Sequence, residues 1–255
     1  MLKDDLSNDL KHLKLPAMAD NLDSRAHQAE EGKLGYLEFT QLLVQDELAS
    51  RESNSFQKRL KVAGVSNRMT FETFDFEFNN AVLPAQTVRD LATCRFIDQH
   101  RNLVLAGPPG IGKSHIAQAV GHEAARRGLD VVVFKTHKLL ERLAPDRFSS
   151  KRSQLLMKRC INAGLLILDD FAFRLYSQQE TELLYTLSDE RLSEGSIVIT
   201  SNRPPEDWFS IFPDAIVGGA IMDRLVSGAL KLIVTSGRSF RKEGVVKLQT
   251  SESAA

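Results

Sequence analysis

The sequence predicts an α/β protein in which a parallel five-stranded sheet lies between helices, preceded by a small all-α N-terminal domain. Three observations lead to this fold class. After about residue 85, five short, almost wholly apolar runs alternate with helical patterns, which is typical of strands buried on both faces of a parallel sheet. A glycine-rich motif joins the first of these runs to a helical pattern. Before Thr70, apolar residues recur at helical spacing and no strand pattern occurs.

Four parts are expected along the chain. Residues 1–68 form the helical domain, and a linker at 69–84 connects it to the α/β domain at 85–245. In the linker, Phe74, Phe76 and Phe78 alternate as in an extended segment. Residues 246–255, which end in TSESAA, are expected to form a disordered tail.

The apolar runs of the second domain predict its strands. These are 103–107, 130–134 (DVVVF), 165–170 (LLILDD), 196–202 (SIVITSN) and 230–236 (LKLIVTS). Open α/β sheets bind ligands beyond the carboxyl ends of their strands. The polar residues that end these runs are therefore candidates for a functional site.

The glycine-rich motif lies in the stretch LVLAGPPGIGKSHIAQAV at 103–120 and spells G-x-x-x-x-G-K-S. Glycines permit turns that point backbone N–H groups at a β-phosphate, and the following helix N-terminus favours negative charge. Lys113 would reach the β- and γ-phosphates, and the Ser114 hydroxyl would coordinate Mg²⁺. A plain strand-to-helix turn is the alternative, but every fixed position of the motif is filled. The expected ATP-binding residues here are Gly107, Pro108, Pro109, Gly110, Ile111, Gly112, Lys113, Ser114 and His115.

Two further strands end in residues suited to nucleotide hydrolysis. Asp169 would hold Mg²⁺ through water, and Asp170 would orient or deprotonate the attacking water. The amide of Asn202 could hydrogen-bond both the γ-phosphate and that water. Taken alone, the aspartates could instead cap the next helix, and Asn202 could simply form a turn.

Arg224 lies in the helical pattern AIMDRLVSGA just before the last strand. It could be a surface arginine paired with Asp223 or solvent. It could also be an arginine finger that stabilises the γ-phosphate charge in a neighbouring subunit. Spacing alone does not separate these interpretations.

Composition excludes several classes of protein. Hydrophobic residues make up 42% and charged residues 26% of the 255 positions, which are ordinary globular values. The start of the chain lacks the apolar core of a signal peptide, and no run approaches the roughly 18 apolar residues of a membrane helix. Cys94 and Cys160 lack the spacing of metal ligands and suit a reducing compartment. We therefore expect a cytoplasmic protein with no membrane partner.

The motifs resemble a known family when they are taken in order. GPPGIGKSH, LLILDDF, ITSNRPPEDW, MDRL and GRSFR are similar to the AAA+ ATPases, and within them to the IstB/DnaC group of the initiator-type clade. ITSNRPPEDWFSIFPD, LKLPAMADNL and TFETFDF most resemble IstB-type insertion-sequence helper ATPases. The resemblance covers about residues 10–242.

This resemblance implies that residues 85–245 form an AAA+ P-loop ATPase domain that uses ATP and Mg²⁺, and that residues 1–68 contact DNA or a partner. It also implies that the protein binds duplex DNA and assembles into a homo-oligomeric ring or helical filament. In that family such an assembly delivers target DNA to an IstA-type transposase. By position, the resemblance makes Asn202 the polar sensor and Arg224 the finger. Asp170 stands where most AAA+ proteins have Glu, and its shorter side chain implies slow hydrolysis, stimulated by DNA or a partner. Arg241 in GRSFR lies where a second sensor arginine would reach phosphate. The resemblance also implies that the C-terminal lid domain that normally carries such an arginine is absent.

A basic stretch provides a candidate DNA contact. Between positions 135 and 159 there are eight Lys or Arg residues and two acids, a net charge of +6. Such residues could neutralise DNA phosphates without reading bases, whereas an ordinary solvated helix face is the alternative. The residues expected to bind DNA are Lys135, Lys138, Arg142, Arg147, Lys151, Arg152, Lys158 and Arg159.

Two functions stay open at this point. One is a transposition helper that presents target DNA to a transposase, and the other is a DnaC-like loader of a replicative helicase. Both bind ATP and both are oligomeric. A small-molecule kinase is disfavoured because no acceptor-site signature accompanies the phosphate loop.

Overall fold

The computed structural model describes residues 2–143, 150–192 and 194–243. The chain divides into two compact units, residues 1–58 and 59–255. The expected limits of linker and ATPase domain stay predictions, and the expected disordered tail lies outside the described residues. Across the three described ranges, no helix combines the length and the apolar character needed to cross a membrane.

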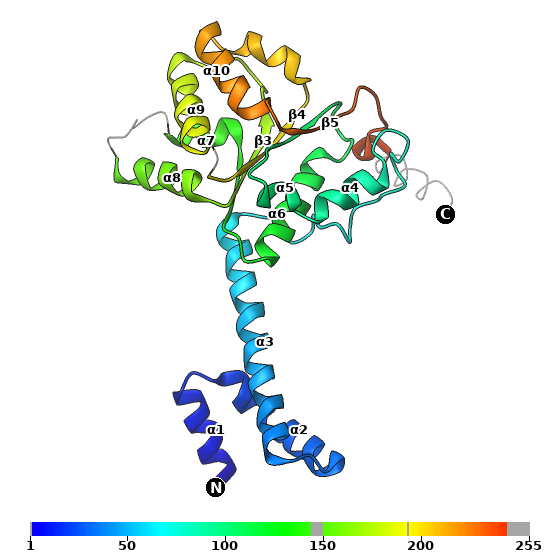
Figure 1. The fold of residues 1–255 in the computed structure, drawn as a ribbon, viewed down its shortest axis with the longest axis vertical. Coiled ribbons are helices and arrows are strands. Elements are labelled where there is room, and N and C mark those ends of the chain that lie inside the picture. The colour runs from blue at the N-terminus through cyan, green and yellow to red at the C-terminus, as the bar shows by residue number, and fades with distance from the viewer. Residues whose placement is uncertain (1, 144–149, 193, 244–255) are drawn as a thin grey trace, which may run out of the picture. The chain divides into compact units, whose positions relative to one another are not determined.

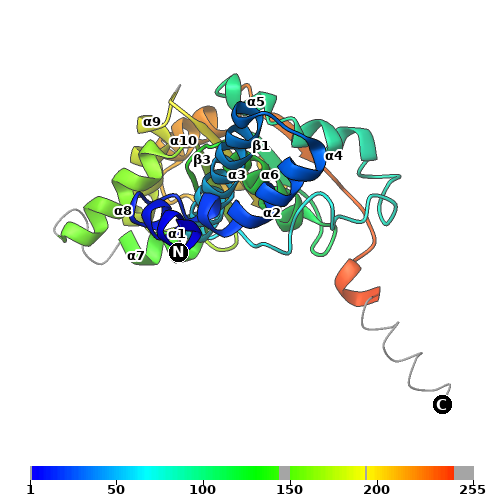
Figure 2. The same ribbon diagram turned by 90° about the horizontal axis from the view of Figure 1, so that it is seen from below.

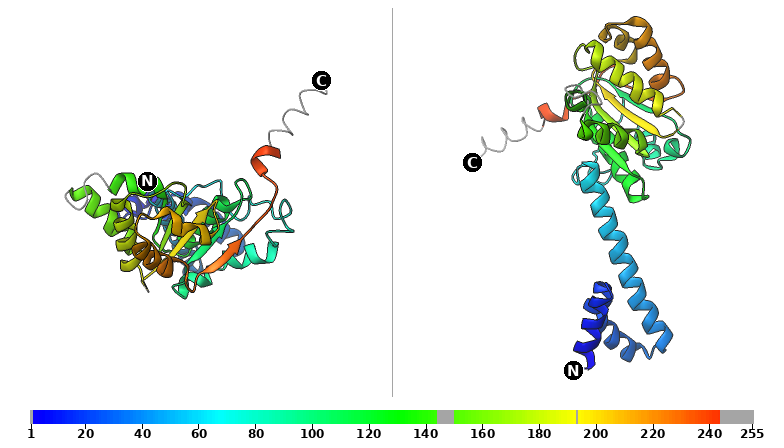
Figure 3. Two further views of the ribbon diagram at one scale, coloured as in Figure 1. Left: turned by 90° about the horizontal axis from the view of Figure 1, so that it is seen from above. Right: turned by 90° about the vertical axis from the view of Figure 1, so that its left-hand side faces the viewer.

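The N-terminal unit is helical, as expected. It contains α1 (Leu2–His12), α2 (Pro16–Gly32) and the first part of α3 (Tyr36–Ala63), which are drawn in Figure 3. Buried Glu47 of α3 accepts hydrogen bonds from the backbone N–H groups of Ala17 (2.9 Å) and Met18 (3.4 Å). A carboxylate at this position satisfies free N–H groups in the first turn of α2. This contact and the Arg25–Asp46 ion pair (2.6 Å) hold α2 against α3.

The second unit contains the five-stranded parallel sheet that the apolar runs predict. Its strands are β1 (Leu103–Ala106), β2 (Val131–Lys135), β3 (Leu165–Phe171), β4 (Ser196–Ser201) and β5 (Leu230–Ile233). They are arranged in the order β2-β3-β4-β1-β5, and every neighbouring pair is parallel. The last strand ends at Ile233 rather than at residue 236. Beyond it the chain passes close to the glycine-rich loop, where the carbonyl of Val234 lies against Gly107.

Helices cover both faces of the sheet (Figures 1 and 2). α4 (Ala85–Ala92), α5 (Arg95–Asp98) and α6 (Lys113–Arg126) lie to one side. α7 (Thr136–Leu143), α8 (Lys151–Asn162), α9 (Gln178–Glu190), the 3₁₀ helix η1 (Pro205–Ile211) and α10 (Ala215–Val226) lie on the other. Val104, Leu166 and Ile199 point into the core of the second group, whereas Ile167 points toward Gly121 of α6. Burial on both faces explains why the strand sequences are apolar at almost every position.

A buried arginine closes the amino-terminal side of the sheet. The guanidinium of Arg191 donates to the carbonyls of Cys160, Ile161 and Ala163 after α8, and to the carbonyl of Ser196 at the start of β4. Burial lowers its pKa to about 10. In the described part of the chain, the hydrogen-bond partners of this guanidinium are backbone carbonyls, and those after α8 are groups that the end of a helix leaves unsatisfied.

The expectation of an extended segment around Phe74, Phe76 and Phe78 is wrong. Residues 64–84 form successive turns and bends, with backbone bonds such as Phe74 N–H to Phe71 O (3.4 Å) and Leu83 N–H to Asn79 O (2.8 Å). The Asp75 carboxylate accepts from the N–H groups of Glu77 and Phe78 and fixes one of these turns. The alternation of phenylalanines in the sequence therefore reflects turns that direct the rings to different neighbours, and not a strand.

Candidate nucleotide site

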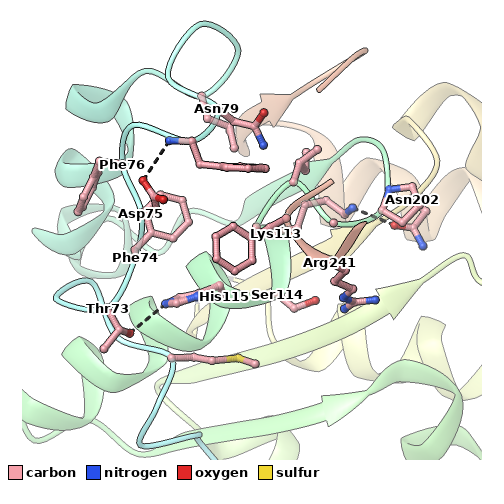
Figure 4. A pocket seen from close by; sticks show the side chains of 18 of the residues that line it. Thr73, Phe74, Asp75, Phe76, Asn79, Lys113, Ser114, His115, Asn202 and Arg241 are labelled. Carbon is pink, nitrogen blue, oxygen red and sulfur yellow. Dashed lines mark hydrogen bonds between the residues drawn. The ribbon is translucent and has the colours of Figure 1, made fainter. Parts of the chain in front are cut away.

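A cavity of about 350 Å³ opens at the carboxyl edge of the sheet, where β1 and β4 end. Three segments and two single residues line it. The segments are the glycine-rich loop with the start of α6, the turns around residues 69–83, and Phe240 with Arg241 near the end of the described chain, and the single residues are Asp170 and Asn202. In Figure 4 the labelled residues of the turns, from Thr73 to Asn79, lie on the left, the start of α6 lies in the centre, and Asn202 and Arg241 lie on the right. A volume of this size accommodates a small-molecule ligand.

The glycine-rich loop has the shape that its sequence predicts. Gly110 and Gly112 have φ angles of 88° and 108°, a region that residues with a Cβ rarely adopt. A Cβ on Gly110 would also collide with Ser239, and one on Gly112 would lie 3.0 Å from the Phe74 ring. The loop leads directly into α6, which begins at Lys113. Its N–H groups and the helix N-terminus thus form a ready site for phosphate.

Lys113 is buried at the centre of the site. Its ammonium donates to the carbonyls of Gly107 and Pro108 and to Oδ1 of Asn202, each at 2.8 Å. Burial lowers the pKa of Lys113 to about 8, although the carboxylates of Asp170 and Asp169 act in the opposite direction. A phosphate is the kind of partner that would restore the charged form.

Asp169 is the point where three elements meet. Its Oδ1 accepts from Ser114 Oγ (2.8 Å) on α6 and from Thr200 Oγ1 (2.6 Å) on β4. The hydroxyl of Ser114 and the carboxylate of Asp169 are hard oxygen ligands of the type that Mg²⁺ prefers, together with phosphate oxygens and water. The two residues therefore fit the metal role expected for them. Sequence reasoning assigned no role to Thr200, which orients this carboxylate.

Asp170 follows in a left-handed backbone conformation, with φ of 55°. Its N–H donates to Thr200 Oγ1 (3.1 Å), and its Oδ2 accepts from the ammonium of Lys135 at 2.7 Å. Non-glycine residues in this region of φ are uncommon and concentrate at functional sites. The hydrogen bond from Lys135 raises the pKa of the lysine. Lys135, expected among the DNA contacts, thus lies directly against the proposed catalytic carboxylate.

The turns at 69–79 supply lining residues that sequence reasoning missed. Phe74 packs edge-on against His115, with ring centroids 5.3 Å apart. Nε2 of His115 lies 2.9 Å from the Thr70 carbonyl and 3.3 Å from Thr73 Oγ1. The three phenylalanines of TFETFDF could have indicated a buried role for this segment, because large apolar side chains are usually buried rather than exposed in a linker.

The C-terminal segment reaches the same pocket. The Asn79 side chain donates to the carbonyl of Arg238 and accepts from its N–H, both at 3.0 Å. Phe240 donates its N–H to the carbonyl of Gly110 (3.0 Å) and packs edge-on against Phe78. These contacts place Arg241 among the residues that line the pocket, where a second sensor arginine was expected. Its charge, like burial, lowers the pKa of Lys113.

Arg224 does not line this pocket. It lies on α10, 2.7 Å from Oδ1 of Asp189, with its guanidinium over the ring of Tyr185 on α9. The carboxylate that pairs with it is therefore Asp189 and not the neighbouring Asp223. A role in its own nucleotide site finds no support here, and a role in another subunit's site stays a proposal.

The basic stretch is divided among different environments. Lys138 and Arg142 on α7, and Lys151, Arg152 and Lys158 on α8, are exposed. Arg142 lies over the Phe134 ring, 5.3 Å from its centroid. Arg159 is exposed but donates to the carbonyl of Val62. Arg147 lies outside the described residues.

Comparison with known proteins identifies relatives along almost the whole chain. The family described as IstB-like ATP binding protein matches residues 8–247. A Mycobacterium tuberculosis protein, named as an ATP-binding protein in an insertion sequence, is 41% identical over 240 residues, which are 92% of this chain and 93% of the relative. The insertion sequence IS21 ATP-binding protein of Pseudomonas aeruginosa is 31% identical over 95% of this chain and 92% of its own length.

Solved structures agree on the fold. AMPPCP-bound DnaA from Aquifex aeolicus has a TM-score of 0.56 at 20% identity, covering 74% of this chain and 56% of that one. This chain therefore spans about half the length of that neighbour. The DnaC helicase loader has a TM-score of 0.51 at 23% identity, covering 59% of this chain and 88% of its own. These likenesses are consistent with an AAA+ type of P-loop fold.

Proposed function

The chain belongs to the family of IstB-like ATP-binding proteins, and from that premise we propose that it is a DNA-binding ATPase that assists transposition. The observation that carries the proposal is the convergence of Lys113, Asp169, Asp170 and Asn202 at one edge of the sheet. Relatives named as insertion-sequence ATP-binding proteins favour this role over that of a helicase loader.

In this proposal, the residues of the site divide the work of ATP hydrolysis. The loop N–H groups and Lys113 bind the phosphates. Ser114 would hold Mg²⁺, with Asp169 acting through water, and the ion would neutralise phosphate charge when it is bound. Asp170 orients the attacking water and accepts its proton, and Asn202 holds the water and the γ-phosphate in register. The pocket walls around Phe74 and Phe78 exclude solvent from the nucleotide. Arg241 adds positive charge near the phosphates.

Arg224 is the residue that would connect ATP hydrolysis to the assembly of subunits. Because it does not line the pocket of its own chain, it would act as a finger only in a ring or filament of identical subunits. Release from Asp189 would then free its guanidinium for the neighbour's γ-phosphate. The transposase that receives the target DNA is proposed on the strength of family membership alone.

Duplex DNA is proposed to lie along the exposed basic residues of α7 and α8. A direct test is the salt dependence of duplex binding for a variant with Lys151, Arg152 and Lys158 all changed to Ala. Arg159 is left in place because it bonds to the Val62 carbonyl, and its removal would confuse folding with binding. We expect weaker binding to every sequence, with the slope of log K against log salt smaller by about 0.9 for each DNA phosphate that the variant no longer neutralises.

A matched control is Lys231→Ala, which removes an exposed lysine from edge strand β5. It should bind DNA as the unmodified protein does. Weakening of the triple variant on a single sequence would mean that these side chains read bases. If the triple variant keeps the duplex affinity and the salt slope of the unmodified protein, then α8 does not contact DNA.

A further inference from the structure

The segment that follows β5 forms a strap beside the phosphate loop. We define the strap as residues 235–241, which lead from the last strand to Arg241. Its backbone is irregular before Phe240, and most of its side chains are exposed, among them that of Arg238. Exposed, irregular backbone loses conformational freedom when it is fixed in one position. Specific contacts with the rest of the domain must therefore fix Arg241 at the pocket.

Asn79 makes such a contact through both ends of its side-chain amide. The amide nitrogen donates to the carbonyl of Arg238, and Oδ1 accepts from the N–H of the same residue, each at 3.0 Å. Asn79 is only 8% exposed, and its own carbonyl accepts from the N–H groups of Val82 and Leu83. An amide is suited to bonding both backbone groups of one residue, because it carries a donor and an acceptor side by side. A buried amide that is fixed in this way holds the strap at Arg238.

The strap continues from this contact onto the phosphate loop. Phe240 donates its N–H to the carbonyl of Gly110 and packs edge-on against Phe78, with ring centroids 5.1 Å apart. Arg241 is the next residue, and it lines the same pocket as Asn79 (Figure 4). Asn79 therefore holds the chain only three positions before the arginine.

We propose that Asn79 is a positioning residue that holds Arg241 at the phosphates of the bound nucleotide. The inference rests on the proposed function and adds to it the residue by which the turns at 69–83 control the position of a second cation. With the strap held, the guanidinium of Arg241 stays in the pocket and bonds to phosphate. With the strap released, this guanidinium leaves the pocket, and Lys113 remains as the cation of the loop.

The test compares the steady-state kinetics of ATP hydrolysis by the full chain for a set of variants. Asn79→Leu keeps the approximate size of the side chain and offers neither bond, whereas Asn79→Ala also removes its volume. Arg241→Ala removes the guanidinium directly, and a further variant combines Asn79→Leu with Arg241→Ala. Arg238→Ala removes the exposed side chain of the bonded residue but keeps both of its backbone groups. Asn54→Leu is the matched control, because Asn54 is exposed on α3 and does not line the pocket.

The inference predicts that Asn79→Leu and Arg241→Ala share one defect. Each should raise the KM for ATP about tenfold or more, the loss expected for a hydrogen bond to a charged group, and should leave kcat within about twofold. The combined variant should be no worse than Arg241→Ala, because Asn79 acts only through that arginine. Asn79→Ala should behave like Asn79→Leu, since the bonds matter and not the volume. Arg238→Ala should change KM far less, and Asn54→Leu should match the unmodified protein.

A second measurement, made without nucleotide, follows the strap itself. Trypsin can cleave after Arg238 and Arg241 when the strap leaves its place, so the cleavage rate at these sites reports the released population. Mass spectrometry of brief digests identifies the sites. Loss of two buried hydrogen bonds in Asn79→Leu should speed cleavage there about five- to a hundredfold, with unchanged rates at sites elsewhere in the chain. A general rise at all sites would instead indicate a destabilised domain and would count against the inference.

The kinetic results separate this inference from the proposed function. A normal KM in Asn79→Leu, or losses that multiply in the combined variant, would overturn the inference. If the unmodified protein hydrolyses ATP and Arg241→Ala has a normal KM, the inference is wrong and the proposed function stands. If the unmodified protein neither binds nor hydrolyses ATP, the proposed function fails and the inference fails with it.

Discussion

The ammonium of Lys113 lies 2.8 Å from Oδ1 of Asn202, across the loop that is proposed to hold the phosphates. The same ammonium donates to two carbonyls of that loop. Groups of the protein itself therefore accept all three of these hydrogen bonds. A γ-phosphate would take the place of these acceptors and would bring Lys113 and Asn202 to the same ligand.

Lys113→Ala should abolish ATP binding. The phosphates would lose the buried cation at the centre of the loop, and the alanine offers no replacement. Titration with a fluorescent ATP analogue measures the effect, and circular dichroism checks that the variant is folded. Undiminished nucleotide affinity in a folded variant would show that the pocket is not the ATP site.

ATP affinity should fall as the pH rises above about 8. Lys113 has a pKa of about 8 in the empty protein, and bound phosphates favour its charged form, so binding takes up a proton above that pH. The affinity should then weaken up to about tenfold per pH unit. Stability of the empty protein should move the other way between pH 8 and 10.5, because the unfolded lysine holds its proton more strongly.

The opposite signs distinguish this effect from alkaline unfolding. Isothermal titration calorimetry between pH 8 and 9.5, in buffers of different ionisation enthalpy, counts the protons taken up. Lys113→Arg is the control, since its guanidinium stays charged and its affinity should not depend on pH in this range. An affinity of the unmodified protein that is constant from pH 8 to 9.5 would contradict the shifted pKa.

Asp170→Asn should bind ATP but stop hydrolysing it. The amide keeps the size of the side chain but cannot accept a proton from water, and loss of a general base costs about 10²–10⁴ in rate. Single-turnover measurements with excess protein separate this loss from any change in binding. Turnover close to that of the unmodified protein would make Asp170 a structural residue.

Arg224→Ala should bind ATP normally and hydrolyse it poorly. Its own phosphate loop is intact, but a finger supplied to a neighbour contributes about 10³–10⁵ in rate in comparable enzymes. Mixing it with Lys113→Ala protein should restore partial activity, because some interfaces then pair an intact loop with an intact finger. Each variant alone, at the total concentration of the mixture, is the control. Co-assembly without any restored activity would exclude the shared site.

The sequence predicts the sheet well because each strand is buried on both faces and therefore apolar throughout. It also predicts the phosphate loop, whose spacing is fixed by backbone geometry. It does not predict Thr200 as the residue that orients Asp169, or Asn79 as the bridge to Arg238. Those contacts join segments up to 159 positions apart, and a single polar residue at either end leaves no periodic pattern. The wrong extended interpretation of Phe74 to Phe78 has a related cause, since turns that direct alternate side chains to different partners imitate the period of a strand.

The pairing of Lys135 with Asp170 has the same origin. Local sequence places Lys135 at the start of a basic stretch, and charge counting cannot tell a DNA contact from an ion pair with a neighbouring strand. Only the parallel register of β2 and β3 brings the two side chains together.

The proposed function combines an ATP site at the loop of Lys113 with duplex binding, and we further propose that bound ATP strengthens the binding of DNA. The most direct measurement is duplex binding at fixed salt with ATP, with ADP and without nucleotide, for the unmodified protein and for Lys113→Ala. We predict that ATP tightens binding by the unmodified protein about tenfold or more, within the usual range of coupling between two sites, and that Lys113→Ala binds equally weakly in all three conditions. Duplex affinity of the unmodified protein that is the same with ATP, with ADP and without nucleotide would contradict the account.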